Sequence, residues 1–210
     1  MSKNIKAIGF DWSGVVFFHA TKYREIGAKF LHITEEEFTS AYFKHNHLHN
    51  LSSVSLLDFW RVVFAELGRE AETVDFLHML SNLPIGTLNH ELLQLLEEVK
   101  QAGYKVGLFS NNSVDGAKEA RSFGVDKLFP VALFSAEVGV MKPQAEAFHL
   151  LAEKLGVDIT EMIFIDDTQK SLEKASEAGY TSILYQDVKT LYQDLEKVGI
   201  SLASRRTPQP

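Results

Sequence analysis

The amino-acid sequence predicts an α/β protein, a doubly wound parallel sheet into which a helical domain is inserted. Three observations support this fold class. The first apolar segment ends at an aspartate, residues 21–82 show helical periodicity without a strand, and from residue 86 onward apolar strands alternate with amphipathic helices. Such alternation is typical of a parallel sheet covered by helices on both faces. A length of 210 residues is ample for a large core and a smaller insert.

The composition excludes several classes of protein. The chain has 21 Lys and Arg against 28 Asp and Glu, which gives a net charge of −7. The only adjacent arginines, Arg205 and Arg206, lie in a Pro-containing tail. The chain therefore lacks the clustered cations of a nucleic-acid binder. The absence of cysteine excludes disulfides, thiolate nucleophiles and thiolate zinc sites. No apolar run approaches the roughly 18 residues of a membrane span, and early charges at Lys3, Lys6 and Asp11 do not fit a secretion signal. We expect a cytoplasmic protein with no nucleic-acid or membrane partner.

The first element is a predicted strand at residues 4–10. Ile8 and Phe10 contribute to its apolar character, and the strand stops at Asp11. Gly14 follows shortly and suits a turn. We therefore expect a short buried strand that leads directly into a turn containing a carboxylate.

The next block of sequence is predicted to form a separate domain of helices. Thr34 and Glu37 have the spacing of a capping box, and Ser55 precedes a run with an apolar helical face. The turn signals at residues 83–86 mark the end of the block. The predicted organisation is an α/β core at residues 1–18 and 86–200, a helical domain at 19–85 and a flexible tail at 201–210.

The second half of the chain repeats a helix followed by a strand. Several of these helices end near a glycine, as helix C-termini commonly do. The strands are predicted at residues 104–109, 131–134, 162–165 and 181–185. The helices are predicted at residues 89–101, 114–122, 144–155, 169–178 and 188–198.

Polar residues follow three of the predicted strands. They lie at residues 11–14, 110–113 and 166–168, and a lysine-proline pair ends the segment 139–143 just before a helix. Ligands of open parallel sheets bind at the carboxyl ends of the strands. We therefore expect carboxylates, a hydroxyl, amides and a lysine to share one crevice.

These residue types suit phosphoryl transfer. Asp11 and Asp166 can hold Mg²⁺, which prefers oxygen ligands, and the bound cation would let one oxygen of Asp11 attack a phosphorus atom. Ser110 and the amides of the following helix suit a phosphate oxygen, and Lys142 supplies a charge for the same group. We therefore expect a small phosphorylated substrate. Further candidates for substrate contact are the neighbouring residues Trp12, Ser13, Asn111 and Asn112.

The same segments resemble the haloacid dehalogenase-like hydrolases. All four motifs of that family are present in the family's order, and the resemblance extends from residue 4 to about residue 200. It implies a Rossmann-like core with a small helical cap inserted after the first motif. The four segments are GFDWSGVV at 9–16, LFSNN at 108–112, KP at 142–143 and IFIDD at 163–167.

The resemblance also implies roles for individual residues. In this family the first aspartate is the nucleophile, which here is Asp11. The family binds its metal through that aspartate, through the backbone carbonyl two residues later and through the aspartate of the fourth motif. Here these groups are Asp11, the carbonyl of Ser13 and Asp166, with Asp167 in the inner or outer coordination shell.

Ser13 departs from the family pattern. Phosphatases of the family carry a second aspartate there as general acid, whereas the dehalogenases carry tyrosine. A positioned acid contributes about 10²–10⁴-fold to the rate, which a serine hydroxyl does not supply at neutral pH. The resemblance therefore implies a phosphatase-like hydrolase with slow turnover on poor leaving groups.

Two alternatives follow from the same departure. One is a degenerate relative that binds a phosphorylated ligand or a protein partner without turnover. The other, less favoured, is phosphonate or haloacid cleavage. Relatives that cleave phosphonates use a cap lysine as Schiff base, and Lys44 is the candidate for that role. The histidines at 45, 47 and 49 fit a solvated surface better than a metal site, because no carboxylate is interleaved with them. Substrate identity and oligomeric state carry no signal in the sequence.

Overall fold

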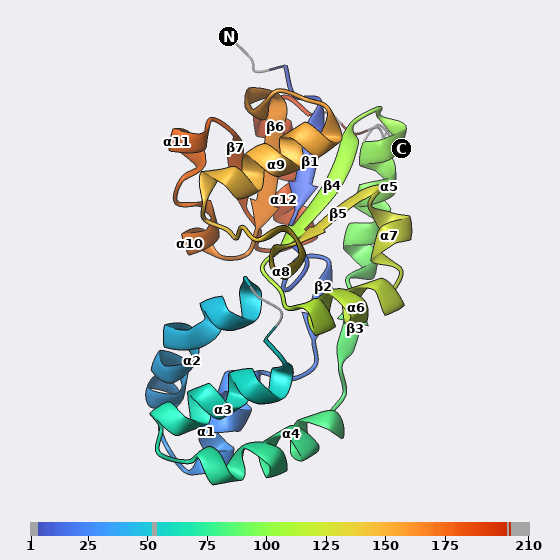
Figure 1. The fold of residues 1–210 in the computed structure, drawn as a ribbon. Helices are drawn as coiled ribbons and strands as arrows, with labels where there is room; N and C mark the ends of the chain where they lie inside the picture. The colour runs from blue at the N-terminus through green and yellow to red at the C-terminus, as the bar shows by residue number, and fades with distance from the viewer. Residues whose placement is uncertain (1–3, 52–53, 201, 203–210) are drawn as a thin grey trace.

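The computed structural model, which describes residues 4–51, 54–200 and 202, contains a five-stranded sheet in the order β5-β4-β1-β6-β7 (Figure 1). Every neighbouring pair of strands in it is parallel. The predicted α/β fold class is confirmed. The strands are β1 (Ala7–Phe10), β4 (Lys105–Ser110), β5 (Val131–Phe134), β6 (Met162–Asp166) and β7 (Thr181–Leu184).

Helices pack on both faces of this sheet, which explains why its central strand β1 is apolar throughout. In β1, Ile8 and Phe10 belong to one core and Ala7 to the other. The first core is completed mainly by α5 (His90–Gln101), α6 (Val114–Ser122), α7 (Val125–Leu128) and α12 (Val188–Lys197). The second is completed mainly by α9 (Ala145–Leu155), α10 (Gln169–Leu172) and α11 (Ala175–Ala178).

Residues between β1 and α5 form a helical layer with its own aromatic core. In this layer Thr34 and Glu37 make both bonds of the expected capping box, and the hydroxyl of Ser55 accepts a bond from the backbone N–H of Asp58. Phe38, Phe59, Trp60, Phe64 and Phe76 are among the core residues of the layer. Its helices are α1 (Tyr23–Leu31), α2 (Glu35–Asn50), α3 (Leu56–Glu66), the short 3₁₀ helix η1 (Glu70–Glu72) and α4 (Thr73–Ser81).

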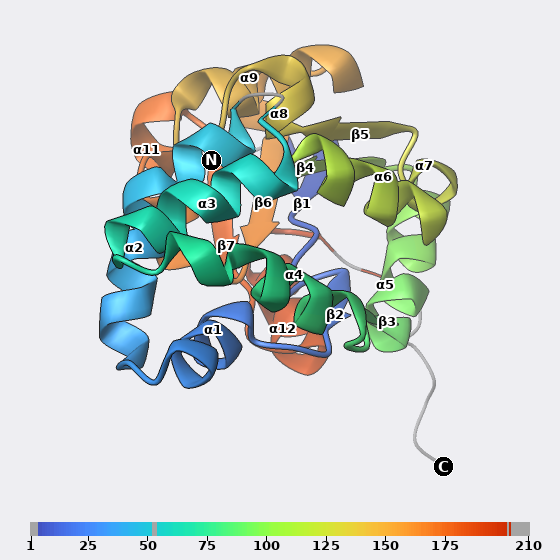
Figure 2. The ribbon, with the colours of Figure 1, turned by 60° about the horizontal axis from the view of Figure 1, so that its bottom comes forward.

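The helical layer lies beyond the carboxyl ends of the sheet strands. Figures 1 and 2 show it on the side of the sheet from which β1 continues toward α1. Helix α2 contacts α8 (Ser135–Val138), the short helix that follows β5. The helices therefore stand on the same side of the sheet as the polar strand ends.

A two-stranded antiparallel ribbon joins the two parts, and the sequence analysis missed it. Strand β2 (Phe17–His19) carries the chain toward the helices and β3 (Gly86–Leu88) brings it back. His19 pairs with Gly86, and the N–H of Ala20 donates to the carbonyl of Ile85 at 3.0 Å. Strands of three residues are too short for the alternation that identifies a strand in a sequence.

One predicted helix differs from the structure. The segment 169–178 forms two single-turn helices, α10 and α11, rather than one continuous helix. The break comes at Glu173 and Lys174, and the two turns pack on different neighbours, α10 on β6 and β7 and α11 on α9 and β7. Apart from Leu202, the predicted flexible tail lies outside the described residues. Within the described part of the chain, no helix has both the length and the apolarity needed to span a membrane.

Candidate active site

The polar strand ends meet at the centre of the sheet. Strand β1 lies between β4 and β6, and Phe10 is in register with Leu108 on one side and Ile165 on the other. The next residue, Asp11, donates its N–H to the carbonyl of Ile165 at 2.9 Å. Because Ser110 and Asp166 end the two neighbouring strands, the register places all three residues at one edge.

Three aspartates converge at this edge. Asp11, Asp166 and Asp167 each offer a carboxylate oxygen, and these oxygens all lie within 4.8 Å of one another. Asp11 and Asp166 are 7% and 1% exposed, whereas Asp167 is exposed. Carboxylate oxygens, partly open to water, are the donors that Mg²⁺ prefers, so this donor set fits that ion.

Gly14 makes room for the third carboxylate. Its backbone has φ = +81°, and a Cβ atom there would lie 2.1 Å from Oδ2 of Asp167. Any other residue would displace the carboxylate as well as strain the turn. The glycine of the first turn thus allows Asp167 to approach the two buried aspartates.

Lys142 supplies the opposing charge. Its side chain is 2% exposed, and Nζ lies 2.7 Å from Oδ1 of Asp11 and 2.5 Å from Oδ2 of Asp166. The ammonium also lies over the ring of Phe164, 5.0 Å from the ring centre. One buried cation between two buried carboxylates leaves one uncompensated negative charge, which favours binding of a cation.

Burial and neighbouring charges shift the pKa values of the aspartates and the lysine in this cluster. It raises the pKa of Asp11 to about 7; Lys142 opposes this rise and Asp166 adds to it. Burial alone would lower the pKa of Lys142, but Asp11 and Asp166 more than offset it and the pKa is raised. Although the residue as a whole is exposed, partial desolvation of its carboxylate first, and Asp166 second, raise the pKa of Asp167. A divalent cation would restore the ionised form of Asp11, because an adjacent positive charge lowers the pKa of a carboxyl group.

Asn111 and Asn112 lie in different surroundings. The side-chain amide of Asn111 bonds the backbone of Lys142 twice, donating to its carbonyl at 2.8 Å and accepting from its N–H at 2.8 Å. The side-chain oxygen of Asn112 instead accepts from the N–H of Ser113, the residue that caps α6. The structure therefore brings Asn111 to Lys142 and directs Asn112 toward a helix start.

Trp12 and Ser13 leave the aspartate cluster in different directions. Trp12 is 1% exposed and stacks on Phe17 with ring centres 5.4 Å apart, so its ring is part of the core, and its contact with substrate stays a prediction. The hydroxyl of Ser13 hydrogen-bonds Nε2 of His19 at 3.1 Å. Burial lowers the pKa of His19, so its ring is neutral at pH 7. Sequence reasoning missed His19, because its proximity to Ser13 depends on the unpredicted ribbon.

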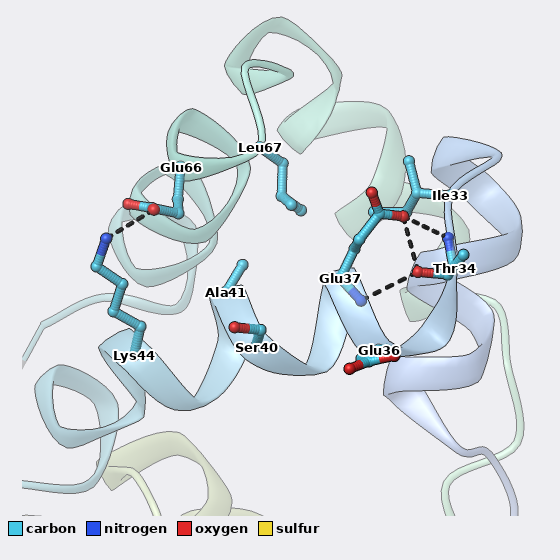
Figure 3. Close-up of a pocket in the computed structure, with 9 residues that line it drawn as sticks. All are labelled: Ile33, Thr34, Glu36, Glu37, Ser40, Ala41, Lys44, Glu66 and Leu67. Carbon is cyan, nitrogen blue, oxygen red and sulfur yellow. Dashed lines mark hydrogen bonds and ion pairs between the residues drawn. The ribbon is translucent and has the colours of Figure 1, made fainter.

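The cap residues that the sequence singled out belong to the helical layer. Lys44 pairs with Glu66 at 2.6 Å, and His45 lies 3.4 Å from the same carboxylate. Lys44 and Glu66 line a pocket of about 470 Å³ between α2 and α3, shown in Figure 3, whose lining residues all come from the helical layer and the turns beside it. His47 is exposed and His49 stacks on a phenylalanine, Phe59, so in the described part of the chain these histidines do not form a metal cluster.

Comparison with known families agrees with this arrangement. The sequence model of one family, described as haloacid dehalogenase-like hydrolase, matches residues 5–179. The chain belongs to the haloacid dehalogenase-like hydrolases. The matched range contains the four strand-end segments and the helical layer between the first two of them. The family resemblance that the sequence motifs predicted is thereby confirmed.

Curated relatives of this haloacid dehalogenase-like chain include phosphatases. A phosphatase from Mycobacterium tuberculosis is 34% identical over 113 residues, which cover 51% of this chain and 52% of the relative. A glyceraldehyde 3-phosphate phosphatase from Methanopyrus kandleri is 27% identical over 108 residues, covering 50% and 46%. The bifunctional epoxide hydrolase 2 of Sus scrofa is 27% identical over 121 residues, 55% of this chain but 22% of that protein. The matches thus span about half or less of each relative.

Solved structures share the whole fold. A haloacid dehalogenase family enzyme from Bacteroides thetaiotaomicron superposes with a TM-score of 0.68 and 21% identity, covering 90% of this chain and 99% of that one. A magnesium complex of the same enzyme gives a TM-score of 0.66 at 22% identity. At this level of identity the likeness shows the fold alone, including the helical layer.

Proposed function

We propose that this protein is a Mg²⁺-dependent phosphatase of a small phosphorylated metabolite that works through an aspartyl-phosphate on Asp11. The observation that carries the proposal is the buried group of Asp11, Asp166 and Lys142 at the carboxyl edge of the sheet, with Asp167 beside it. The phosphatases among the relatives favour a phosphate ester over other substrates. The magnesium complex of the Bacteroides enzyme favours the metal.

In this proposal Asp11, Asp166 and Asp167 hold Mg²⁺, together with the backbone carbonyl of Ser13. The bound ion supplies charge neutralisation between the nucleophile and the phosphate. Lys142 adds a second positive charge from inside the protein, already fixed by its two carboxylate partners. Preformed charges of this kind need no reorganisation during the reaction.

The reaction has two displacements at phosphorus. An oxygen of Asp11 attacks, the P–O bond to the leaving alcohol breaks, and the bonding electrons depart with that oxygen. Water then attacks the same phosphorus, the bond to the Asp11 oxygen breaks, and inorganic phosphate leaves with the carboxylate regenerated. The Ser110 hydroxyl, at the end of β4, and the N–H groups that open α6 would donate to phosphate oxygens in both steps.

The leaving alcohol receives little help from the protein. Ser13 occupies the position of the family's general acid and bonds to His19, whose ring is neutral at pH 7 because burial lowers its pKa. We therefore expect faster turnover of esters whose leaving group is stable as an anion. The helical layer at residues 19–85 would act as the cap that contacts the rest of the substrate.

The test is hydrolysis of an aryl phosphate in Mg²⁺ by the natural protein and by Asp11→Asn. The amide is close in size to the carboxylate but cannot attack phosphorus, so we expect the loss of at least about 10³-fold in kcat. Exposed Ser40→Ala in α2 serves as a control that should keep the activity. Activity retained by Asp11→Asn would refute the mechanism.

A binding-only protein is the second candidate, and Ser13 favours it because the proton donor is missing. The two functions differ in one measurement. Rapid quenching after mixing with ³²P-labelled substrate traps a phosphoryl group on Asp11 in the phosphatase. A binding-only protein shows thermal stabilisation by phosphate but no label on the chain.

A further inference from the structure

The side chain of Asn111 attaches the backbone of the loop that carries Lys142 to the sheet. Asn111, directly after β4, makes two bonds of 2.8 Å to the backbone of Lys142, one to its N–H and one to its carbonyl. We propose that Asn111 is a positioning residue for the ammonium of Lys142 and does not contact the substrate. This inference rests on the proposed function for its effect on turnover, but not for its effect on Lys142.

The chemistry of asparagine fits this attachment. A side-chain amide presents one acceptor and one donor side by side, and the backbone of a single residue presents the complementary donor and acceptor. Asn111 thus bonds Lys142 in the manner of a neighbouring strand. Aspartate has the same shape but no donor, and its second oxygen would face the carbonyl of Lys142. One N–H and the oxygen of the amide both bond Lys142, so the loop backbone, and not a phosphate, sets the orientation of this side chain.

Two other hydrogen bonds shape the loop without connecting its backbone to the sheet. The N–H of Met141 donates to Oε1 of Gln144 at 2.8 Å, and the N–H of Gln144 donates to the carbonyl of Met141 at 2.9 Å. Both bonds stay within the loop, whereas Asn111 connects it to the end of β4. Gln144 is exposed and therefore offers a matched control in the same loop.

The position of this backbone matters because the lysine side chain is long. Lys142 has four rotatable bonds between its backbone and an ammonium that must reach Asp11 at 2.7 Å and Asp166 at 2.5 Å. A shift of about 1 Å in a positioning group can cost about 10²-fold in rate. Fixing both backbone groups of Lys142 removes the freedom that such a shift needs.

The first experiment observes the ammonium directly. In protein labelled with ¹⁵N at lysine Nζ, a buried ammonium held by two carboxylates should give a slowly exchanging NMR signal, assigned by its loss in Lys142→Arg. We expect the signal to shift or disappear in Asn111→Ala and in Asn111→Asp, and to remain in Gln144→Ala. An unchanged signal in Asn111→Ala would overturn the proposal. This readout needs no turnover, so it separates failure of this inference from failure of the proposed phosphatase activity.

The second experiment is a double-mutant cycle measured with an aryl phosphate in Mg²⁺. We expect Asn111→Ala to lower kcat by about 10²-fold in the natural protein and by less than about threefold in a Lys142→Met background. A residue that touches the substrate itself would cost the same factor in both backgrounds, which would refute the proposal. Asn111→Asp separates positioning from space filling, because the isosteric variant keeps full activity if Asn111 only fills space. If Lys142→Met does not fold, Lys142→Arg replaces it in the cycle.

Discussion

Ser13 stands where the family resemblance predicts a general-acid aspartate in a phosphatase. Its hydroxyl lies 3.1 Å from Nε2 of His19, and the lowered pKa of that histidine leaves the pair without an acidic proton at pH 7. An aspartate at this position would occupy the place of the general acid that the family resemblance implies. We therefore expect a serine at this position to affect departure of the leaving group and not attack by the nucleophile.

We expect Ser13→Asp to raise kcat for an alkyl phosphate by about tenfold or more, because a positioned acid contributes about 10²–10⁴-fold. The same variant should change the hydrolysis of an aryl phosphate much less, since that leaving group departs without a proton. The measurement is steady-state hydrolysis of both esters in Mg²⁺. Equal effects on the two esters would contradict a role for position 13 in proton transfer.

A second residue prediction concerns the stability of the helical layer. Burial lowers the pKa of His49, although Asp115 opposes the shift, and the ring stacks on Phe59. The unfolded chain, with an ordinary value near 6.5, therefore binds a proton more readily than the folded protein. The contribution of the neutral His49 ring to stability is therefore complete above about pH 6.5. It is lost as the pH falls toward the lower pKa of His49 in the folded protein.

We expect His49→Phe to keep the ring contact and to weaken the dependence of stability on pH. The free energy of unfolding of the natural protein should fall more between about pH 7.5 and about pH 5 than that of the variant. Urea unfolding at both values provides the measurement. His47→Gln changes an exposed histidine of the same helix and should leave the dependence as it is.

At the scale of residues, the sequence predicts positions better than contacts. The strand ends predict that Asp11, Asp166 and Lys142 share one edge, and the structure agrees; their roles stay predictions. The partners of Asn111, Trp12 and Ser13 depend on which way each side chain turns after its strand. That direction is set by tertiary packing, which spacing along the chain does not contain.

Among the elements, helices α1 and α2 pack unusually closely. Gly27 in α1 faces the ring of Phe38 in α2, and a Cβ atom on Gly27 would lie 2.1 Å from the ring carbon Cζ. Helix α1 is therefore built around a residue with low helix propensity. The packing of Phe38 that Gly27 allows compensates for the low helix propensity of glycine.

We expect Gly27→Ala to lower the free energy of unfolding by up to about 2 kcal/mol. Alanine gains about 1 kcal/mol in helix propensity, but a methyl group against a buried ring costs about 1–3 kcal/mol or more. Urea unfolding of the variant measures the balance, and exposed Ser40→Ala in α2 provides the comparison without a packing change. A Gly27→Ala protein more stable than the natural one would show that Phe38 can move aside.

The elements differ in how far a sequence predicts them. Helix α6 and strand β5 have the predicted bounds, because each has a clear apolar pattern and clear ends. Segment 169–178 has the pattern of one helix, yet its two halves share only β7 as a partner, and α10 also packs on β6 whereas α11 also packs on α9. The β2–β3 ribbon leaves no pattern at all, since each strand has three residues and its pairing partner is distant in the sequence.

At the scale of the molecule, the ribbon is the place where the helical layer can be removed. Residues 19 and 86 pair across it, so the two cut ends already lie side by side in antiparallel strands. A two-residue Asn-Gly turn is the favoured short connection between such strands. The helices also have a core that includes no residue of the sheet.

We expect a chain in which Asn-Gly replaces residues 20–85 to fold cooperatively and to hydrolyse an aryl phosphate in Mg²⁺. It should lose most discrimination among phosphorylated metabolites, because the cap contacts are gone. Thermal unfolding followed by circular dichroism and a panel of substrates provide the two measurements, with Asp11→Asn in the shortened chain as control. A shortened chain that does not fold would show that the sheet depends on the helices.

The central position of β1 has a consequence for the growing polypeptide. This strand is made first, yet Ala7 pairs with Lys105 on one side and Met162 on the other, so both neighbours are synthesised much later. Pairing between such distant segments is slow, whereas α1–α4 are close in sequence and can complete their own core while the strand still lacks partners. The order of synthesis therefore favours a nascent chain whose helices are finished before the sheet begins.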